Sequence, residues 1–262
     1  LVGRDLELDF LRGQWQRIAE LGRGRVLVVT GEPGVGKTRL IDEAVDRLRD
    51  EGRVLQATCP AYGSLAGAAV ATSLGRQLQA IEASRSGMSL DEEGMGRLRR
   101  LIAARSGEGP VLLVIDDLHR APAGEVDSIA QFCARLTEIP VLILLAGRTQ
   151  PGDWLARFAG ATTIHLEQLP TRDATSLAHL LAAGLDLSHP DAEDLAERAC
   201  GNPLHLRELV ALLRRRGGAG GADLQLPATL RAVLAARLDE LAAADRAVLQ
   251  DVSVFSDGAS RE

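Results

Sequence analysis

Short apolar runs alternate with amphipathic segments over the first two thirds of the chain. The runs are rich in valine, leucine and isoleucine and too short for helices, so they predict buried strands at residues 25–30, 53–57, 111–116, 140–146 and 162–166. Apolar residues recur at helical spacing between them, at residues 5–21, 40–48, 66–83, 92–105 and 124–137. In the first helix, the residues expected to face the core are Leu6, Phe10, Leu11, Ile18 and Leu21, with Trp15 partly buried. Strands that alternate with helices predict an α/β fold with a parallel sheet covered on both faces.

The pattern changes after Leu169 and Pro170, because helical periodicity continues without strands. Helices are expected at 171–183, 191–199 and 203–215, and the first two have plausible start signals at Thr171 and Ser188. A glycine-rich linker follows at 217–221, and two short helices are expected at 228–240 and 243–251. We therefore predict a sheet domain at 1–168, a small helical lid at 169–221 and the beginning of a further domain at 222–262.

The segment GEPGVGKT at 31–38 matches the phosphate-loop pattern G-x-x-x-x-G-K-[ST]. A predicted strand precedes it and a predicted helix follows it, as phosphate binding requires: glycines let backbone N–H groups face the phosphates, and the helix N-terminus adds partial positive charge. Lys37 is the only lysine in 262 residues, which suits a site that needs a compact ammonium rather than a guanidinium. We expect Lys37 to reach the β- and γ-phosphates and Thr38 to ligate Mg²⁺. The expected nucleotide-binding residues of this segment are Gly31, Glu32, Pro33, Gly34, Val35, Gly36, Lys37, Thr38 and Arg39.

Two carboxylates follow the predicted strand at 111–116. Asp116 and Asp117 lie at its C-terminal end, where open α/β sheets bind ligands. Asp116 is the expected second Mg²⁺ ligand, acting through water. Asp117 is expected to orient or deprotonate the attacking water, or alternatively to cap the turn after the strand.

A further candidate follows the strand at 140–146. Arg148 is expected at the same edge of the sheet as Asp116, where it would contact the γ-phosphate. The alternative is an exposed loop arginine, and position alone does not separate the two.

The net charge of −6 and pI near 5.5 argue against a nucleic-acid-binding surface on this chain. The one basic cluster, 214–216, is better explained as a charged helix C-terminus than as a DNA contact. The three cysteines have no metal or redox spacing, so we expect reduced thiols in a cytoplasmic protein. No apolar stretch approaches 18 residues, no signal peptide is visible, and no membrane partner is expected. Because the chain starts at Leu1 without methionine, we expect a piece of a longer protein.

Taken together and in order, these segments resemble the nucleotide-binding core of STAND-class ATPases. The nearest resemblance is to the AAA-type ATPase modules of large bacterial LuxR-type (MalT-like) transcription regulators. It rests on six segments: LVGRDLEL at 1–8, GEPGVGKTRL at 31–40, VIDDLH at 114–119, LAGRT at 145–149, GNPL at 201–204 and LPATLRAVL at 226–234. The resemblance implies a P-loop fold, a helical lid and the beginning of a winged-helix domain.

The resemblance also implies roles for matching residues. Val2, Gly3 and Arg4 would lie against the adenine and ribose, Pro203 would close over the base, and Arg148 would sense the γ-phosphate. For Pro203 the alternative is an ordinary turn between helices. The family often has tryptophan and an acidic residue after Leu-His, where this chain has RAP at 120–122, so the loop beside the Mg²⁺ site is expected to differ. His119 keeps the family's histidine, and an exposed loop position remains the alternative for it.

Three functions fit these residues. The first is an ATP switch of a transcription regulator that rests with ADP, self-assembles with ATP and reaches DNA only through a domain absent from this chain. The second is a ring-forming motor or loader ATPase, which would need an arginine finger from a neighbour. The third is the regulatory core of a signalling enzyme such as a cyclase or kinase.

Overall fold

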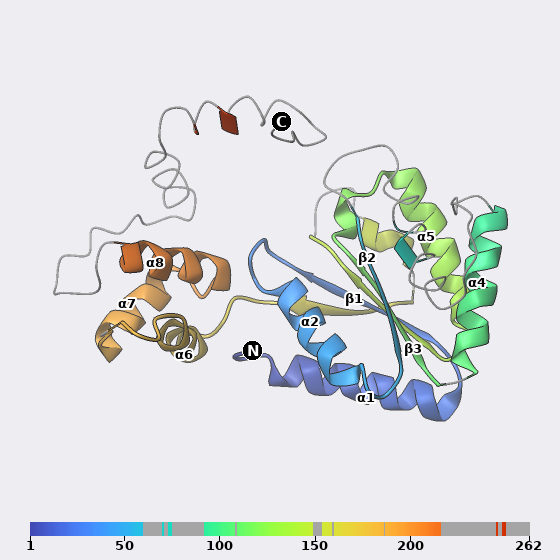
Figure 1. Cartoon of the computed structure of the whole chain (residues 1–262), viewed down its shortest axis with the longest axis horizontal. Helices are drawn as coiled ribbons and strands as arrows, with labels where there is room; N and C mark the ends of the chain where they lie inside the picture. Colours follow the sequence, from blue (N-terminus) through green and yellow to red (C-terminus); the bar gives the residue numbers. More distant parts are fainter. Residues whose placement is uncertain are drawn as a thin grey trace. The chain divides into compact units, whose positions relative to one another are not determined.

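Two compact units make up the chain in this computed structural model (Figure 1). The first comprises Leu1, Gly3–Glu32 and Lys37–Leu166, and the second comprises Val2, Pro33–Gly36 and the described residues from Glu167 onward. The structure describes residues 1–59, 70, 73–74, 92–107, 109–148, 154–158, 160–185, 187–215, 245 and 248–249.

A five-stranded parallel sheet forms the centre of the first unit (Figure 1). Its spatial order is β2-β3-β4-β1-β5, and each neighbouring pair runs parallel. Because β4 lies between β3 and β1, the loops that follow these three strands leave the same edge of the sheet side by side. The strands are β1 (Arg25–Gly31), β2 (Arg53–Thr58), β3 (Val111–Asp116), β4 (Val141–Ala146) and β5 (Thr162–Leu166). The predicted α/β fold with a parallel sheet is confirmed.

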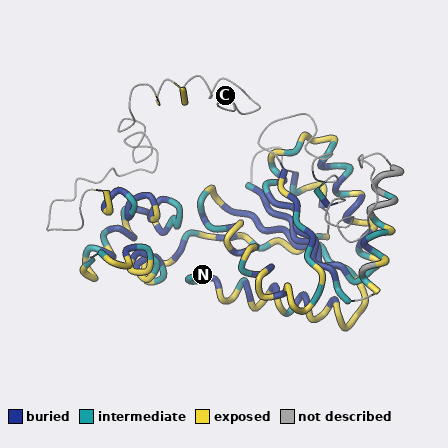
Figure 2. Tube along the Cα trace, viewed as in Figure 1, coloured by how far each residue is buried: buried dark blue, intermediate teal, exposed yellow. Residues whose placement is uncertain are grey.

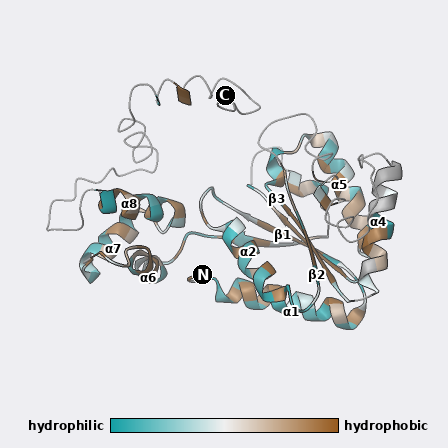
Figure 3. Ribbon diagram, in the orientation of Figure 1, coloured by the Kyte–Doolittle hydropathy of each residue, from teal (hydrophilic) through white to brown (hydrophobic). Residues whose placement is uncertain are grey.

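Helices cover both faces of this sheet. On one face lie α1 (Asp5–Leu21) and α2 (Lys37–Leu48), and on the other α4 (Glu92–Ser106) and α5 (Ala123–Leu136) (Figure 1). The helices show apolar and polar sides in Figure 3, as expected of elements packed on one side only. Two short 3₁₀ helices that the periodicity did not predict are η1 (Leu118–Arg120) and η2 (Trp154–Arg157).

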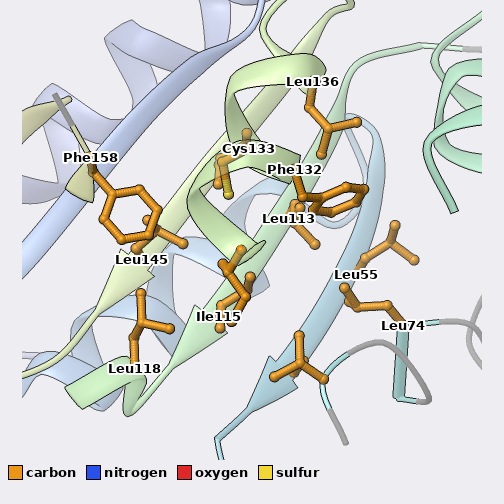
Figure 4. Close-up of a cluster of buried hydrophobic side chains, with 14 of the residues drawn as sticks. Leu55, Leu74, Leu113, Ile115, Leu118, Phe132, Cys133, Leu136, Leu145 and Phe158 are labelled. Atoms are coloured by element: carbon orange, nitrogen blue, oxygen red, sulfur yellow. The ribbon is translucent and has the colours of Figure 1, made fainter. Parts of the chain in front are cut away.

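The core lies on both faces of the central strands. Every residue of β3 and β4 is buried, as the dark strands of Figure 2 show. Leu113, Ile115 and Leu145 lie on the face toward α5, against Phe132 and Leu136 (Figure 4). Since side chains alternate along a strand, the intervening residues of the same strands face α1 and α2. This two-sided burial is why these strands appear in the sequence as unbroken apolar runs.

The second unit is helical in its described part. It contains α6 (Thr171–Leu181), α7 (His189–Arg198) and α8 (Pro203–Arg215). Its core is small and alanine-rich, which lets the helices approach closely: Ala178, Ala192 and Leu195 pack with Leu206, Leu209 and Leu213. The start signal at Ser188 is confirmed, because its side chain accepts a hydrogen bond from the backbone N–H of Asp191. The first of these helices starts after Pro170, so Thr171 is its first residue rather than its cap.

The predicted inward face of the first helix is partly wrong. Leu6, Phe10 and Leu21 are 84%, 38% and 62% exposed. The buried stripe instead runs through Leu8, Leu11, Trp15 and Ile18, and Trp15 is more deeply buried than expected. At 100° per residue, Leu6 lies on the side of the helix opposite this stripe, and Phe10 and Leu21 lie outside the stripe on its flank.

Some predicted elements lie outside the described residues. The helix at 66–83 is described only at residues 70, 73 and 74, and the beginning of a further domain at 222–262 only at residues 245, 248 and 249. The domain boundaries given above therefore remain predictions. In the described part of the chain, no helix has the length and apolar character needed to cross a bilayer.

Candidate functional site

The phosphate loop joins β1 to α2, as its sequence predicted. Gly34 and Gly36 have φ of 80° and 105°, backbone angles that side chains with a Cβ rarely adopt. Lys37 opens α2, and its Nζ donates hydrogen bonds of 2.9 Å to the carbonyl oxygens of Gly31 and Glu32. The ammonium is thus held over the loop's own backbone, which places the charge where a phosphate would be cradled.

Asp116 lies directly opposite the start of α2. The Thr38 hydroxyl donates to Asp116 Oδ2 at 2.7 Å, and the backbone N–H of Asp117 donates to Asp116 Oδ1 at 2.7 Å. The Asp116 side chain is only 8% exposed. These bonds fix both carboxylate oxygens and bring the two predicted Mg²⁺ ligands together across 78 residues of sequence.

The Asp117 carboxylate is engaged with the 3₁₀ turn that follows. Asp117 has a left-handed backbone (φ 56°) and makes no side-chain capping bond to that turn, which does not support the alternative of a cap. Arg120 Nη1 lies 2.9 Å from Asp117 Oδ2, and His119 Nδ1 lies 3.9 Å from Oδ1. No sequence pattern predicted the Arg120 contact, although the segment RAP at 120–122 already indicated an unusual loop.

Arg148 follows β4, the strand between β1 and β3. Its backbone is fixed by Trp154, whose indole N–H donates to the Arg148 carbonyl oxygen at 2.9 Å. The ring also packs on Gly147, where an added Cβ would lie 2.6 Å from Trp154 Cζ2. Trp154 therefore holds the backbone that carries Arg148. The sequence did not predict this contact, because Trp154 belongs to no motif.

The electrostatics of the site connect these side chains. Burial, and next the positive charge of Arg148, lower the pKa of Lys37, while Asp116 and Asp117 oppose that shift. Burial also lowers the pKa of His119, against the raising effect of Asp117. Burial raises the pKa of the Cys59 thiol to about 12, with a smaller contribution from Asp117. Lys37 and Arg148 therefore repel each other, and a bound anion between such charges would relieve that repulsion.

Other predicted site residues are not brought to this constellation by any described contact. The Arg39 side chain is 59% exposed and pairs with Glu43 at 3.2 Å. Arg4 is buried at the start of α1 and pairs with Glu7 at 3.1 Å. Gly3 has a positive φ of 65°, and Val2 belongs to the second unit.

Pro203 is the first residue of α8, in the unit that also contains Pro33–Gly36. Within that unit the preceding Asn202 contacts the phosphate loop: its Nδ2 donates to the Pro33 carbonyl oxygen at 3.0 Å. The N–H of Leu204 donates to the Gly34 carbonyl oxygen at 3.2 Å. The sequence did not single out Asn202 as a loop contact.

The donor set fits Mg²⁺ held together with a nucleotide. Thr38 and Asp116 supply a hydroxyl and a carboxylate oxygen, and Mg²⁺ in such sites takes one or two protein ligands plus phosphate oxygens and water. Within the described residues no group of three or more histidine, cysteine, aspartate or glutamate side chains could hold a metal by itself. Chemically, the arrangement can bind a polyphosphate, polarise it and place a carboxylate beside it.

Comparison with known proteins agrees with this chemistry. Residues 1–145 match the family described as AAA ATPase domain. A curated relative, an uncharacterized protein of Rhizobium meliloti (strain 1021), is 23% identical over an alignment of 260 residues that covers 80% of this chain. The chain spans 24% of the length of that relative.

Solved structures share the fold at low identity. Cdc6p from Pyrobaculum aerophilum has a TM-score of 0.62 at 16% identity, over 82% of this chain and 63% of the other. A STAND protein with a tetratricopeptide repeat sensor from Pyrococcus horikoshii has a TM-score of 0.58 at 18% identity, over 98% of this chain and 35% of the other. The Drosophila ORC bound to DNA has a TM-score of 0.57 at 14% identity, over 81% and 61%.

Proposed function

Because the chain belongs to the AAA ATPase domain family, we propose that its ATPase site works as a regulatory switch in a bacterial transcription regulator. In this proposal ADP maintains a resting state, and ATP permits self-association. Hydrolysis is slow and resets the switch. DNA is reached only through a part of the protein outside this chain.

The proposed chemistry uses the constellation at the edge of the sheet. Lys37 binds the β- and γ-phosphates, and Thr38 and Asp116 hold Mg²⁺, which neutralises charge on the transferred phosphoryl group when bound. Asp117 orients the attacking water. Arg148, whose charge already acts on Lys37, contacts the γ-phosphate.

The proposed switch responds to the presence of one phosphate, the γ-phosphate of ATP. To move a two-state equilibrium from 1:99 to 99:1, a ligand must favour one state by about 5.5 kcal/mol. Lys37, Mg²⁺ and Arg148 are charged groups that would contact the γ-phosphate of ATP and have no such partner in ADP. Differential contacts of this kind are what a ligand needs to shift an equilibrium between states.

The observation that carries the proposal is the joint placement of Lys37, Thr38 and Asp116 in a chain of this family. The regulatory assignment draws further support from the likeness, over 98% of this chain, to a protein described as a signal transduction ATPase with numerous domains. The transcription-regulator context rests on the resemblance of sequence segments.

The first test identifies the nucleotide that copurifies with the chain. The freshly purified protein is denatured and the released nucleotide is identified by chromatography, with Lys37→Ala as the control. The switch predicts stoichiometric ADP in the wild type, none in the variant, and a larger species by light scattering when ATP·Mg²⁺ replaces ADP. Equal affinity for ADP and ATP with no change in assembly would refute the switch, and fast, concentration-dependent turnover would instead favour the motor.

A further inference from the structure

Asn202, the N-cap of α8, both caps the helix and contacts the phosphate loop with the same side chain. Asn202 Oδ1 accepts hydrogen bonds from the backbone N–H groups of Leu204 at 3.0 Å and His205 at 3.2 Å, which is the capping role typical of asparagine. The same amide donates from Nδ2 to the Pro33 carbonyl oxygen at 3.0 Å. A cap needs only the acceptor, so the donor contact to the phosphate loop is an additional role.

The loop is shaped to receive this contact. The Gly34 carbonyl oxygen accepts a hydrogen bond from the N–H of Leu204 at 3.2 Å, so two successive carbonyl groups of the loop are bound by the start of α8. At Gly34 a Cβ would lie 2.6 Å from Leu204 Cβ and 2.7 Å from Asn202 Oδ1. The close approach and the positive φ of 80° therefore both require glycine here.

The turn that presents Asn202 is itself fixed. Gly201 has φ of 70°, and a Cβ at this position would overlap the Leu169 carbonyl oxygen, so no larger residue fits without a shift. The N–H of Leu169 in turn donates to the Gly201 carbonyl oxygen at 2.9 Å. Pro203, at the first helical position, has no N–H to satisfy. Asn202 is thus held between a rigid turn and a helix start, which limits the freedom of its amide.

Binding of these carbonyl groups sets the direction of the loop's N–H groups. In a planar trans peptide the C=O of one residue and the N–H of the next point in opposite directions. With the Pro33 and Gly34 carbonyl groups directed at α8, the N–H groups of Gly34 and Val35 are directed away from it. Backbone N–H groups of this loop are the donors that phosphate oxygens require.

We propose that Asn202 is a positioning residue for the phosphate loop, which orients the peptide groups of Pro33–Val35 for the phosphates of a nucleoside di- or triphosphate. The inference rests on the proposed nucleotide binding and adds to it a residue of the helical unit. Nucleotide affinity then depends on a side chain that need not touch the nucleotide.

Two substitutions separate this role from capping. Asn202→Ser keeps a good N-cap oxygen but is too short to donate to Pro33, whereas Asn202→Ala removes both functions. Loss of one ordinary hydrogen bond predicts that both variants bind ADP and ATP about three- to tenfold more weakly, measured by titration with a fluorescent nucleotide. The unfolding midpoint of the nucleotide-free protein should fall less for serine than for alanine, because serine loses only the bond to Pro33 and keeps the cap.

Kinetics provide a readout that a merely structural role would not change. The loop contacts phosphates in the ground state and in the transition state, so KM for ATP should rise in the serine variant with little change in kcat. The proposal would be overturned if Asn202→Ser bound nucleotide with wild-type affinity, or if only kcat fell in this variant. If the wild type and Lys37→Ala both fail to bind nucleotide, the proposed function itself fails. If only Lys37→Ala fails and serine matches the wild type, this inference alone is lost.

Discussion

At the scale of single residues, the Lys37 side chain combines burial, a lowered pKa and two hydrogen bonds to the phosphate loop. Its ammonium is buried, its pKa is lowered first by burial and then by Arg148, and two loop carbonyl groups hold it. Charge alone is not what this position selects, because every other cationic residue apart from histidine is arginine. The contacts at 2.9 Å to two neighbouring carbonyl oxygens leave room for a compact ammonium.

Lys37→Arg is therefore expected to lose nucleotide binding although it keeps the charge. The planar guanidinium cannot occupy the space between the loop carbonyl groups, so we expect affinity for ADP to fall by about 100-fold or more, measured by calorimetric titration. Arg47→Lys is the matched control, an exposed residue of the same helix that pairs with Glu43. Retention of wild-type affinity in Lys37→Arg would show that the site selects charge and not shape.

Arg120 is the first residue of the segment RAP at 120–122, where the loop beside the proposed Mg²⁺ site was expected to differ from that of LuxR-type modules. It holds Asp117 at 2.9 Å, on the oxygen remote from His119. In phosphoryl transfer the position of the nucleophile matters more than the strength of the base. Arg120→Ala should therefore lower kcat for ATP hydrolysis about three- to tenfold and leave the affinity for ATP unchanged.

Single-turnover kinetics with the wild type, Arg120→Ala and Arg120→Lys test this expectation. Lysine should recover part of the lost rate, because it restores a cation near Asp117. A faster alanine variant would mean that Arg120 restrains Asp117 instead of orienting it.

At the scale of elements, local sequence signals decide where a helix begins, whereas packing against neighbours decides which face of a helix is buried. The cap at Ser188 is local: a side-chain oxygen, a proline two residues later and an acidic residue in the first turn suffice. The buried face of α1 cannot be predicted from local sequence, because apolar residues lie on more than one side of this helix. Packing against neighbouring elements decides which of them are buried. Leu6 and Leu8 are two residues apart, yet one is exposed and the other is 3% exposed.

Ser188→Ala should destabilise the helical unit. Loss of the N-cap oxygen leaves the Asp191 N–H without its partner, which costs about 1 kcal/mol of unfolding free energy. Denaturant unfolding followed by circular dichroism measures it. Ser176→Ala is the control, because Ser176 lies within α6 and bonds back to the Arg172 carbonyl oxygen, a contact that does not favour the helix. Equal effects of both substitutions would argue against a capping role.

At the scale of the whole molecule, stability and pH are linked through buried groups. His205 is 6% exposed, and burial lowers its pKa from the ordinary value of 6.5. The unfolded chain therefore binds this proton more readily than the folded chain between the lowered value and 6.5. The contribution of neutral His205 to the free energy of unfolding is therefore fully present above pH 6.5. It is lost as the pH falls from 6.5 through the lowered pKa of the folded chain.

His205→Leu should reduce this acid sensitivity. The variant should lose less unfolding free energy than the wild type between pH 7.5 and pH 5.5, because a leucine has no proton to bind in the unfolded state. Thermal unfolding at the two pH values measures the difference, and His179→Leu, which removes an exposed histidine, is the control. A wild type and variant with the same pH dependence would show that His205 is not a source of it.

The sequence by itself determined the order of the strands and of the described α-helices along the chain. It also determined the position of the phosphate loop and the position of Asp116 at the end of β3. These features depend on short-range pattern and backbone conformation. Buried strands have to be apolar, and a loop at φ of 80° or 105° has to use glycine. Tertiary structure alone decided which strands are neighbours and therefore which loops meet. Thr38 and Asp116 are 78 residues apart and come within 2.7 Å only because parallel strands end at one edge. It also decided the contacts of Trp154 with Arg148 and of Asn202 with Pro33, since hydrogen bonds between distant residues leave no periodic trace in sequence.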